Sequence, residues 1–321
     1  MDYQESTKVT VLQRLFDAFV SQKKIALQQI THDFALNESE ILLLIKQLAN
    51  MGLKLHYDGV YFSHHYTIDA LDGAIILQNL RSRNIELPLF FQFSLPSTYE
   101  LAKDSKKAGV FLCEYQSKGH GKQSSVWHAP VGRAILLSMN YHLAISYQAL
   151  AGLNIAIAVA IIKTAAVFGQ TQLQLKWSND VFLHKKKAAG ILINISPYAN
   201  GKIITIGIGI NWQLQKHELN RIEQKSTNIS IKNTKRSTFI SELIYQIDTI
   251  IQEFSQSQLH NILPLWHEKD MCLNKTVTVS QDNKTWHARY LGVNKHGLAV
   301  LEKPQSKELS LLASGSIRLI S

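Results

Sequence analysis

The longest apolar run of this chain, at residues 149–162, constrains the fold most, because a helix that is apolar all round must be buried all round. The run reads ALAGLNIAIAVAII; it contains one amide, Asn154, and is followed by Lys163. As a helix it would rise about 21 Å, which is short of the roughly 30 Å needed to cross a bilayer. The run therefore predicts the central helix of a large hydrophobic core.

The bulk composition bounds the class of protein. The 321 residues predict two or three domains, and 45% hydrophobic with 18% charged residues excludes a disordered chain. The net charge of +10 favours anionic partners such as nucleic acid, nucleotides or acidic proteins. Cys113 and Cys272 lie in unrelated segments, which argues against a disulfide framework or zinc site and favours a reducing compartment. The opening MDYQESTKVT lacks the order of a signal peptide, so we expect a cytoplasmic protein without a membrane span.

Residues 1–66 are predicted to form a winged helix-turn-helix, a common DNA-binding module. Three segments with helical spacing come first. Asn37 and Glu40 have the spacing of a capping box at the start of the third helix. Two short alternating runs follow, joined by Asp58-Gly59, which predicts a type I′ hairpin.

The remainder of the chain divides into a connecting helix at 67–85, a mixed α/β unit at 86–270 and a small all-β barrel at 271–321. Strand candidates in the α/β unit lie at 89–95, 110–115, 134–141, 172–176, 189–195 and 203–211. Helices are expected at 97–103, at 149–168 and within the amphipathic stretch that follows residue 237.

The segment EYQSKGHGKQSSVW combines glycines with basic side chains. Gly119 and Gly121 alternate with Lys118, His120 and Lys122. Such glycines free backbone N–H groups to converge on an anion, and the basic groups add positive charge. A flexible solvated loop is the alternative, and the segment by itself would favour it.

A second basic stretch, KKKAAGIL, joins lysines to small residues at 188–190, which allow a ligand or another backbone to approach closely. Lys187 is the lysine nearest to that point and is expected to project toward a buried anion. Lys185 and Lys186 are expected to stay in water. The alternative is a charged hairpin tip.

Two further stretches carry polar groups. In WSND, Asp180 could hold Mg²⁺ or orient a neighbour, and Asn179-Asp180 could equally cap a turn. IGIGIN, at 206–211, alternates isoleucine with glycine, so that its bare face can accept a flat ligand or a helix, and Asn211 could bind phosphate or metal. A plain core strand is the alternative.

Together with Ser97-Thr98 at a predicted helix start, these stretches resemble the bacterial family of bifunctional biotin protein ligases and biotin operon repressors, biotin--[acetyl-CoA-carboxylase] ligases. The family patterns are E-Y-Q-x-x-G-R-G-R-x-G-R-x-W, K-W-P-N-D with R-K-x-A-G-I-L, and G-x-G-x-N. The resemblance implies an α+β multidomain protein: an N-terminal winged helix-turn-helix, a central mixed α/β ligase core with a class II synthetase-like sheet, and a C-terminal SH3-like barrel.

The resemblance also implies the reaction. Biotin, as substrate, would react with ATP in the presence of Mg²⁺ to give biotinyl-5′-AMP and pyrophosphate. A lysine of the biotin carboxyl carrier protein of acetyl-CoA carboxylase would then take the biotin and release AMP. The implied partners further include a DNA operator and a second copy of the chain, joined through the edge of the central sheet.

The same resemblance assigns residues to roles. Catalytic roles fall to Lys187 and Lys122. The implied biotin contacts are Ser97, Thr98, Tyr99, Gln116, His120, Gly121, Lys122, Lys187 and Gly190. The implied ATP contacts are Gly119, His120, Lys122, Trp127, Lys176, Asn179 and Asn211. Asp180 is the candidate metal ligand.

The chain departs from the family pattern in two places of the core. The basic loop replaces the family's arginines and third glycine with other residues: His120, Lys122, Gln123, Ser124 and Ser125. Ser178 replaces the proline of K-W-P-N-D, and Tyr99 stands where the family has a smaller polar residue. Since lysine does not replace arginine at a bidentate site, we expect an active ligase that holds its adenylate more loosely.

The third N-terminal helix departs further. Its DNA-facing positions are expected to include Glu38, Glu40, Leu43 and Leu44, with Lys46 as the main basic group. Because carboxylates repel phosphates, the repressor module is expected to have weakened or altered DNA binding.

Two alternatives to a ligase remain. One is a biotin-responsive transcriptional repressor with reduced ligase activity, against which the acidic helix argues. The other is a lipoate or octanoyl transferase, against which the helix-turn-helix, the barrel and the GxGxN strand argue.

Overall fold

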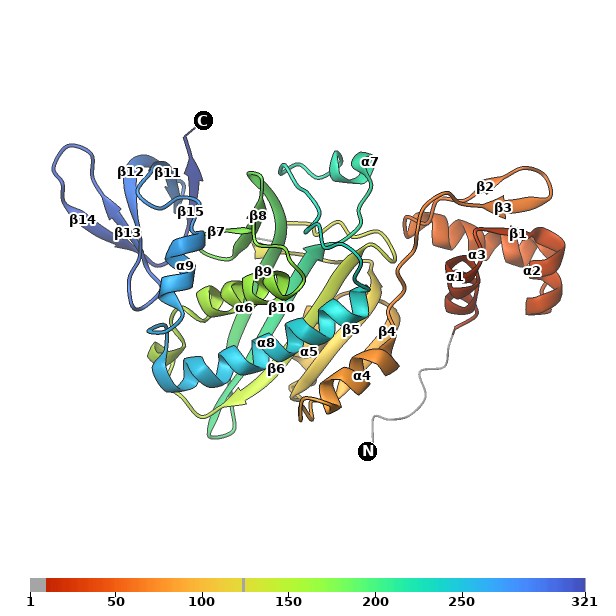
Figure 1. Cartoon of the computed structure of the whole chain (residues 1–321), viewed down its shortest axis with the longest axis horizontal. Coiled ribbons are helices and arrows are strands. Elements are labelled where there is room, and N and C mark those ends of the chain that lie inside the picture. Colours follow the sequence, from red (N-terminus) through yellow and green to blue (C-terminus); the bar gives the residue numbers. More distant parts are fainter. Residues whose placement is uncertain (1–9, 123–124, 321) are drawn as a thin grey trace.

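The computed structural model describes residues 10–122 and 125–320 (Figure 1). The N-terminal elements lie at one end of the molecule, a large sheet with its helices in the middle, and a second sheet at the other end. The N-terminal elements are α1 (Val11–Ser21), β1 (Lys24–Ala26), α2 (Leu27–Phe34), α3 (Glu38–Asn50), β2 (His56–Tyr57) and β3 (Tyr61–Ser63). Their strands form an antiparallel sheet in the order β1-β3-β2.

Helix α3 begins at the predicted capping box. The Asn37 side chain accepts a hydrogen bond from Glu40 N at 3.0 Å, and the Glu40 carboxylate accepts one from Asn37 N at 2.9 Å. These bonds satisfy donors that would otherwise be orphaned at a helix start.

The hairpin tip is present, but its predicted turn type is wrong. Tyr57 pairs with Phe62, so the loop is longer than two residues, and only Gly59 has a positive φ, at 97°. The Asp58 carboxylate instead accepts hydrogen bonds from Val60 N and Tyr61 N at 3.0 and 2.8 Å. This side-chain capping replaces the paired left-handed residues of a type I′ turn.

The central sheet has seven strands in the order β4-β5-β6-β10-β9-β8-β7, of which β4 and β5 pair in parallel and the other neighbours antiparallel. Its strands are β4 (Leu89–Leu95), β5 (Gly109–Gln116), β6 (Ala134–Leu143), β7 (Gln174–Lys176), β8 (Asp180–Leu183), β9 (Lys186–Tyr198) and β10 (Gly201–Asn211). The helices of this unit are α4 (Gly73–Arg81), α5 (Thr98–Ser105), the 3₁₀ helix η2 (Gln148–Leu150), α6 (Leu153–Val167), α7 (Lys216–Leu219), α8 (Arg236–Ser257) and α9 (Leu263–Lys269).

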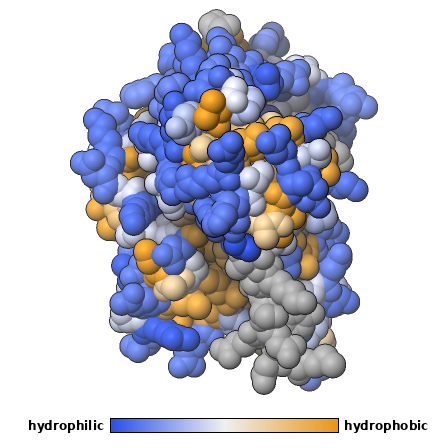
Figure 2. Space-filling view, turned by 90° about the vertical axis from the view of Figure 1, so that its right-hand side faces the viewer, coloured by the Kyte–Doolittle hydropathy of each residue, from blue (hydrophilic) through white to orange (hydrophobic). Residues whose placement is uncertain are grey.

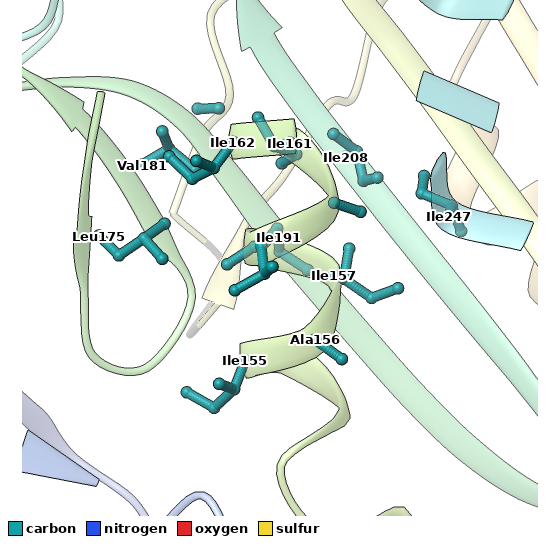
Figure 3. Close-up of a cluster of buried hydrophobic side chains, with 14 of the residues drawn as sticks. Ile155, Ala156, Ile157, Ile161, Ile162, Leu175, Val181, Ile191, Ile208 and Ile247 are labelled. Atoms are coloured by element: carbon teal, nitrogen blue, oxygen red, sulfur yellow. The ribbon is translucent and has the colours of Figure 1, made fainter. Parts of the chain in front are cut away.

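The apolar run forms the predicted core helix, α6, which begins at Leu153 because Gly152 takes a left-handed conformation before it. Figure 3 shows side chains of α6, such as Ile157 and Ile161, packed between the strands of the sheet and Ile247 of α8. Within the described residues, the stretch 148–167 is long and apolar enough to cross a membrane by composition, but 67% of its most apolar window is buried in the structure.

The two faces of the central sheet carry different helices. Helices α4, α6 and α8 share one hydrophobic cluster with one face. Helix α5 covers the other face, where Leu101 packs with Cys113 and Leu136.

The C-terminal sheet contains β11 (Thr276–Gln281), β12 (Lys284–Val293), β13 (Ala299–Glu302), β14 (Leu309–Leu312) and β15 (Ser316–Leu319). The strands are ordered β14-β13-β12-β11-β15 and all pairings are antiparallel. Both predicted turns occur: Asp282 and Asn283 have φ values of 47° and 62°, and Gly297 has 73°.

Candidate functional site

A cavity of about 1080 Å³ opens between the α5 face of the central sheet and the C-terminal sheet. The structure places twelve of the residues assigned from the sequence in its lining: Ser97, Thr98, Tyr99, Gln116, His120, Gly121, Lys122, Trp127, Asn179, Asp180, Lys187 and Gly190. Gly207 and Gly209 of IGIGIN also line the cavity. The four stretches singled out in the sequence therefore meet at one cleft.

Lys187 projects into this cleft from the start of β9. Its Nζ atom lies 2.8 Å from Oδ1 of Asp180, and the two side chains are only 19% and 17% exposed. Lys185 and Lys186 are exposed, as expected. The ammonium beside this carboxylate is therefore directed at the cleft rather than at bulk water.

The main chain of Lys187 is held as firmly as its side chain. Lys187 N donates to the carbonyl of Lys225 at 2.9 Å, and Thr227 N donates to the carbonyl of Lys187 at 2.9 Å. The segment 225–227 therefore runs alongside the catalytic candidate as a short parallel bridge.

Lys122 contributes a second cation to the cleft. Its ammonium donates to the Ser178 hydroxyl at 2.9 Å, which joins the basic loop to the turn before β8. Burial lowers the pKa of Lys122; Asp180 opposes this shift and the nearby Lys187 adds to it. Gln123 and Ser124 of the same loop lie outside the described residues.

The opposite end of the cleft holds a connected set of polar groups. Thr98 N and Thr98 Oγ1 donate to the Gln116 side-chain oxygen at 2.7 and 3.0 Å, and Thr98 Oγ1 lies 2.9 Å from the Ser138 hydroxyl. Ser97 caps α5 by accepting from Glu100 N at 3.3 Å. These fixed donors and acceptors can orient a small polar ring.

Tyr99 and His120 close this end. A Cβ on Gly207 would lie 2.8 Å from the Tyr99 ring, so the bare strand lets the ring lie directly on it. Burial and the Glu100 carboxylate raise the pKa of Tyr99 to about 12. His120 meets Tyr99 edge-on and its Nε2 lies 3.0 Å from the Glu100 carboxylate.

Trp127 lies over the remaining glycines. A Cβ added to Gly209 would come within 2.4 Å of the indole, and one on Gly190 within 3.3 Å. The indole Nε1 is buried and, among the described residues, has no hydrogen-bond partner. The alternating glycines of β10 therefore accept aromatic side chains of the protein itself.

Three assigned residues lie outside the lining of the cleft, so their ATP contacts stay predictions. Asn211 is buried behind Lys187, and its amide donates to the carbonyls of Lys187 at 3.4 Å and Thr227 at 3.1 Å. Gly119 faces a second cavity of about 440 Å³ behind the loop. Lys176 lies over the Phe182 ring, and burial lowers its pKa.

The proposed metal ligand does not form a metal site by itself. Within residues 10–122 and 125–320, no group of three or more His, Cys, Asp or Glu side chains could hold an ion. Asp180 is a single carboxylate already paired with Lys187. Mg²⁺ usually takes one or two protein carboxylates together with substrate phosphates, so these residues alone do not fit a resident ion.

Sequence reasoning missed several lining residues. Ser138 could have been found as a polar residue inside the apolar run AILLSMNY. Glu100, which pairs with the lining residue His120, could have been found as the third residue of a capped helix. The C-terminal sheet also reaches the cleft through 280–285 and 313–318, including Lys284 and Arg318. Nothing local in the sequence marks that contact, because it depends on how the units pack.

Comparison with known proteins agrees with the geometry. The model of the Biotin/lipoate A/B protein ligase family matches residues 92–211. The bifunctional ligase/repressor BirA of Escherichia coli is 27% identical over 201 residues, which cover 62% of this chain and 63% of that protein. Its namesake in Salmonella typhimurium is 24% identical over 283 residues, covering 86% and 88%.

Solved structures show the same fold. Biotin protein ligase from Aquifex aeolicus in complex with biotin and ATP has a TM-score of 0.60 at 19% identity, covering 72% of this chain and 98% of that one. The matched residues run from within β4 to the end of β10 and include the strands that line the cleft: β5, β6, β8, β9 and β10. Residues 92–211 therefore match a family of ligase enzymes, and the chain is similar to biotin protein ligases in sequence and in fold.

Proposed function

We propose that this protein is an active biotin protein ligase. It activates biotin with ATP to biotinyl-5′-AMP and transfers the biotin to a lysine of a biotin carboxyl carrier protein. The observation that carries the proposal is the position of the Lys187 ammonium, inside a cleft walled by the glycines of β9 and β10.

The first step needs positive charge at its centre. A biotin carboxylate oxygen attacks the α-phosphorus of ATP, the bond from that phosphorus to the bridging oxygen breaks, and pyrophosphate leaves. Both reactants are anionic, so a cation fixed between them before the reaction lowers the barrier. Lys187 supplies that cation and Lys122 a second one at the mouth of the loop.

The second step transfers the acyl group. The neutral amine of the carrier lysine attacks the carbonyl carbon of the mixed anhydride, AMP leaves, and the nitrogen loses a proton. The nucleophile of this step is the lysine of the carrier, so the enzyme need not supply one. The enzyme contributes mainly position and charge.

The substrates are assigned to the two ends of the cleft. Ser97, Thr98 and Gln116 supply the polar contacts for the biotin head group, with Tyr99 and His120 beside it. Trp127 gives the adenine a flat apolar surface. Mg²⁺ would arrive with the triphosphate, and no step is assigned to it.

The flanking units complete the proposal. The N-terminal unit is a winged helix-turn-helix and the C-terminal sheet an SH3-like barrel. A relative named biotin--[acetyl-CoA-carboxylase] ligase, from Mycobacterium tuberculosis, supports the carrier protein of that carboxylase as acceptor. A cytoplasmic location and a homodimer through the edge of the central sheet belong to the same proposal.

The surface of the N-terminal unit argues against strong DNA binding. Residues 1–66 contain six basic and seven acidic residues, a net charge of −1, whereas the whole chain carries +10. On α3, Leu42 and Leu43 are 45% and 57% exposed, and Figure 2, viewed from this side, shows apolar groups among the hydrophilic ones. Leu44, expected to face DNA, instead packs partly buried against the core.

A carrier-labelling assay tests the enzymatic function. The full-length protein is incubated with biotin, MgATP and a biotin carboxyl carrier domain, and the carrier is probed with streptavidin. We expect ATP-dependent labelling of the carrier. Unlabelled carrier, together with no turnover of ATP, would contradict the proposal.

A further inference from the structure

The N-terminal unit shares a hydrophobic core with the ligase unit. Phe93 of β4 and Val131 lie in the same buried cluster as α1 to α3, and the Phe16 and Phe93 ring centroids are 5.2 Å apart. Val131 N donates to the carbonyl of Met51 at 2.8 Å, just after α3 ends. The N-terminal unit is therefore packed onto the turn that follows Trp127, rather than joined to it by a free linker.

A buried arginine marks this contact. Arg133 ends the turn and immediately precedes β6; its side chain is 3% exposed. Its guanidinium lies 4.0 Å from the centroid of the Tyr66 ring, which belongs to the N-terminal unit. The Tyr66 hydroxyl is itself held by the main chain of Lys54, at 2.8 and 3.0 Å.

Arg133 also holds the loop 212–229, which follows β10. Its guanidinium pairs with the Glu218 carboxylate of α7 at 2.6 Å, and Glu218 is likewise 3% exposed. The carbonyl of Arg133 accepts from Trp212 N at 3.1 Å and Gln213 N at 3.0 Å. Both the start of this segment and its helix are thus fixed to one residue.

The far end of the same segment holds Lys187. Leu214 and Asn228 close it into a loop, with hydrogen bonds of 2.9 Å in both directions. Between them, the main chain at 225 and 227 bonds the main chain of Lys187. Tyr66, Arg133 and Glu218 are thus in contact at one part of the loop 212–229, and the same loop bonds the main chain of the cleft lysine at 225 and 227.

We propose that Arg133 and Glu218 form a positioning pair, through which the N-terminal unit and the loop 212–229 fix the main chain of Lys187 and hence the place of its ammonium. The proposal rests on the ligase function given above. Neither residue lines the catalytic cleft, so both act through another residue.

Loss of either charge of the Arg133–Glu218 pair is expected to disturb the structure around it, for a physical reason. Removing one partner of a buried ion pair leaves the other charge uncompensated, and the structure around it relaxes to reach water. Relaxation at α7 moves the loop that bonds Lys187. Misplacement of a catalytic group by about 1 Å can lower a rate about 100-fold.

Glu218→Gln tests the pair, with Glu242→Gln as the matched control. Arg83 and Glu242 form an ion pair of the same length, 2.6 Å, between the end of α4 and α8, and neither lines the cleft. At a temperature where both variants are folded, we expect Glu218→Gln to lower kcat for adenylate formation at least about tenfold, with KM for biotin within about twofold. Glu242→Gln should keep kcat unchanged, and Glu218→Asp should recover part of it. Equal kcat in wild type and Glu218→Gln would overturn the proposal.

Hydrogen exchange separates this inference from the ligase function. Amide exchange is followed in the full chain without substrates, so the readout needs no activity. In Glu218→Gln we expect faster exchange at Lys187 and Thr227, whose amides donate across the bridge, and unchanged exchange in Glu242→Gln. Unchanged exchange at both amides in Glu218→Gln would refute the positioning role even if the protein is an active ligase.

A third variant tests the link to the N-terminal unit. Tyr66→Leu keeps an apolar side chain but removes the ring beside Arg133 and the hydroxyl bonded to Lys54. The same two amides should exchange faster than in wild type, by a smaller factor than in Glu218→Gln. If they do not, the N-terminal unit has no part in the pathway.

Discussion

Lys187 lies against the cleft wall at Gly190, where an added Cβ would come within 3.2 Å of the lysine side chain. Changing Lys187 to Ala removes the ammonium paired with Asp180, so we expect adenylate formation to fall by about 10²–10³-fold. The exposed neighbour gives the control, and Lys186→Ala should retain the wild-type rate. Acid-quenched formation of biotinyl-AMP measures both. A Lys187→Ala protein with normal rate would remove the residue from the mechanism.

Gly209 offers a second prediction, because its missing side chain admits Trp127. In Gly209→Ala the new Cβ collides with the indole at 2.4 Å. Overpacking of this kind costs about 1–3 kcal/mol, so ATP should bind roughly 5- to 150-fold more weakly. Gly73→Ala is the control, since its Cβ would meet no atom closer than 3.9 Å. Isothermal titration with ATP distinguishes the two, and equal ATP affinity would contradict the assignment of Trp127.

The lowered pKa of Lys122 predicts how the activity depends on pH. Its pKa is lowered by burial, so its positive charge is lost on the alkaline side at a lower pH than for an exposed lysine. Activity should therefore fall as pH rises through that lowered pKa. Lys122→Arg keeps its charge over the whole range, so its alkaline limb should move to higher pH. If kcat/KM depends on pH in the same way in wild type and in Lys122→Arg, another group is responsible for the loss of activity at high pH.

The residues of the cleft could be predicted only where a motif stated their role. Lys187 was separable from Lys185 and Lys186 because small residues follow it directly. The surroundings of Asn211 could not be predicted, because the Thr227 and Lys187 carbonyls to which its amide donates are brought to it by a loop that no local pattern describes.

At the scale of elements, periodicity predicted most strands and helices of the central unit, and β4 falls at the predicted bounds of 89–95. The sequence DVFL, at 180–183, was not among the predicted strands, whereas it forms β8. Three of its four residues are buried, so the segment shows no alternation that would reveal a strand. The charged hairpin tip that was the alternative for the lysine run is present at His184 and Lys185, which connect β8 to β9. Strand order and the β1–β3 pairing depend on tertiary contacts and were not predicted.

Helix α8 is joined to the sheet and to the connecting segment by a buried charge. Arg236 is fully buried; it donates to the Glu114 carboxylate at 2.6 Å and to the carbonyls of Ala134 and Asp69. Because Arg236→Met leaves the buried Glu114 carboxylate without its cationic partner, we expect the free energy of unfolding to fall by about 3–5 kcal/mol.

Urea denaturation of the Arg236→Met protein measures this change. The double variant Arg236→Met with Glu114→Leu removes both charges and should recover most of the loss. A single variant as stable as wild type would show that the ion pair does not hold α8 in place.

At the scale of the whole molecule, the positive charge does not lie where a DNA-binding unit would need it. Residues 1–66 carry −1 and the remainder of the chain therefore +11. DNA affinity that depends on phosphate contacts weakens steeply with salt. We expect no sequence-specific shift of a biotin-operon fragment at nanomolar protein with biotin and ATP. A specific, salt-sensitive shift would show that the N-terminal unit still binds an operator.

The packing of the units explains why the positions of the N-terminal unit and the C-terminal sheet could not be predicted from the sequence. The C-terminal sheet adds residues 280–285 and 313–318 to the cleft, and the N-terminal unit shares its core with Phe93 and Val131. Each unit was visible as a separate pattern. Their contacts arise from surfaces that become continuous only after folding.

The most direct measurement is mass spectrometry of the protein after incubation with biotin and MgATP in the absence of any carrier. The account predicts stoichiometric biotinyl-5′-AMP with release of pyrophosphate, formed about 10²–10³-fold more slowly by Lys187→Ala. A folded wild-type protein that binds biotin and ATP but forms no biotinyl-5′-AMP would contradict it.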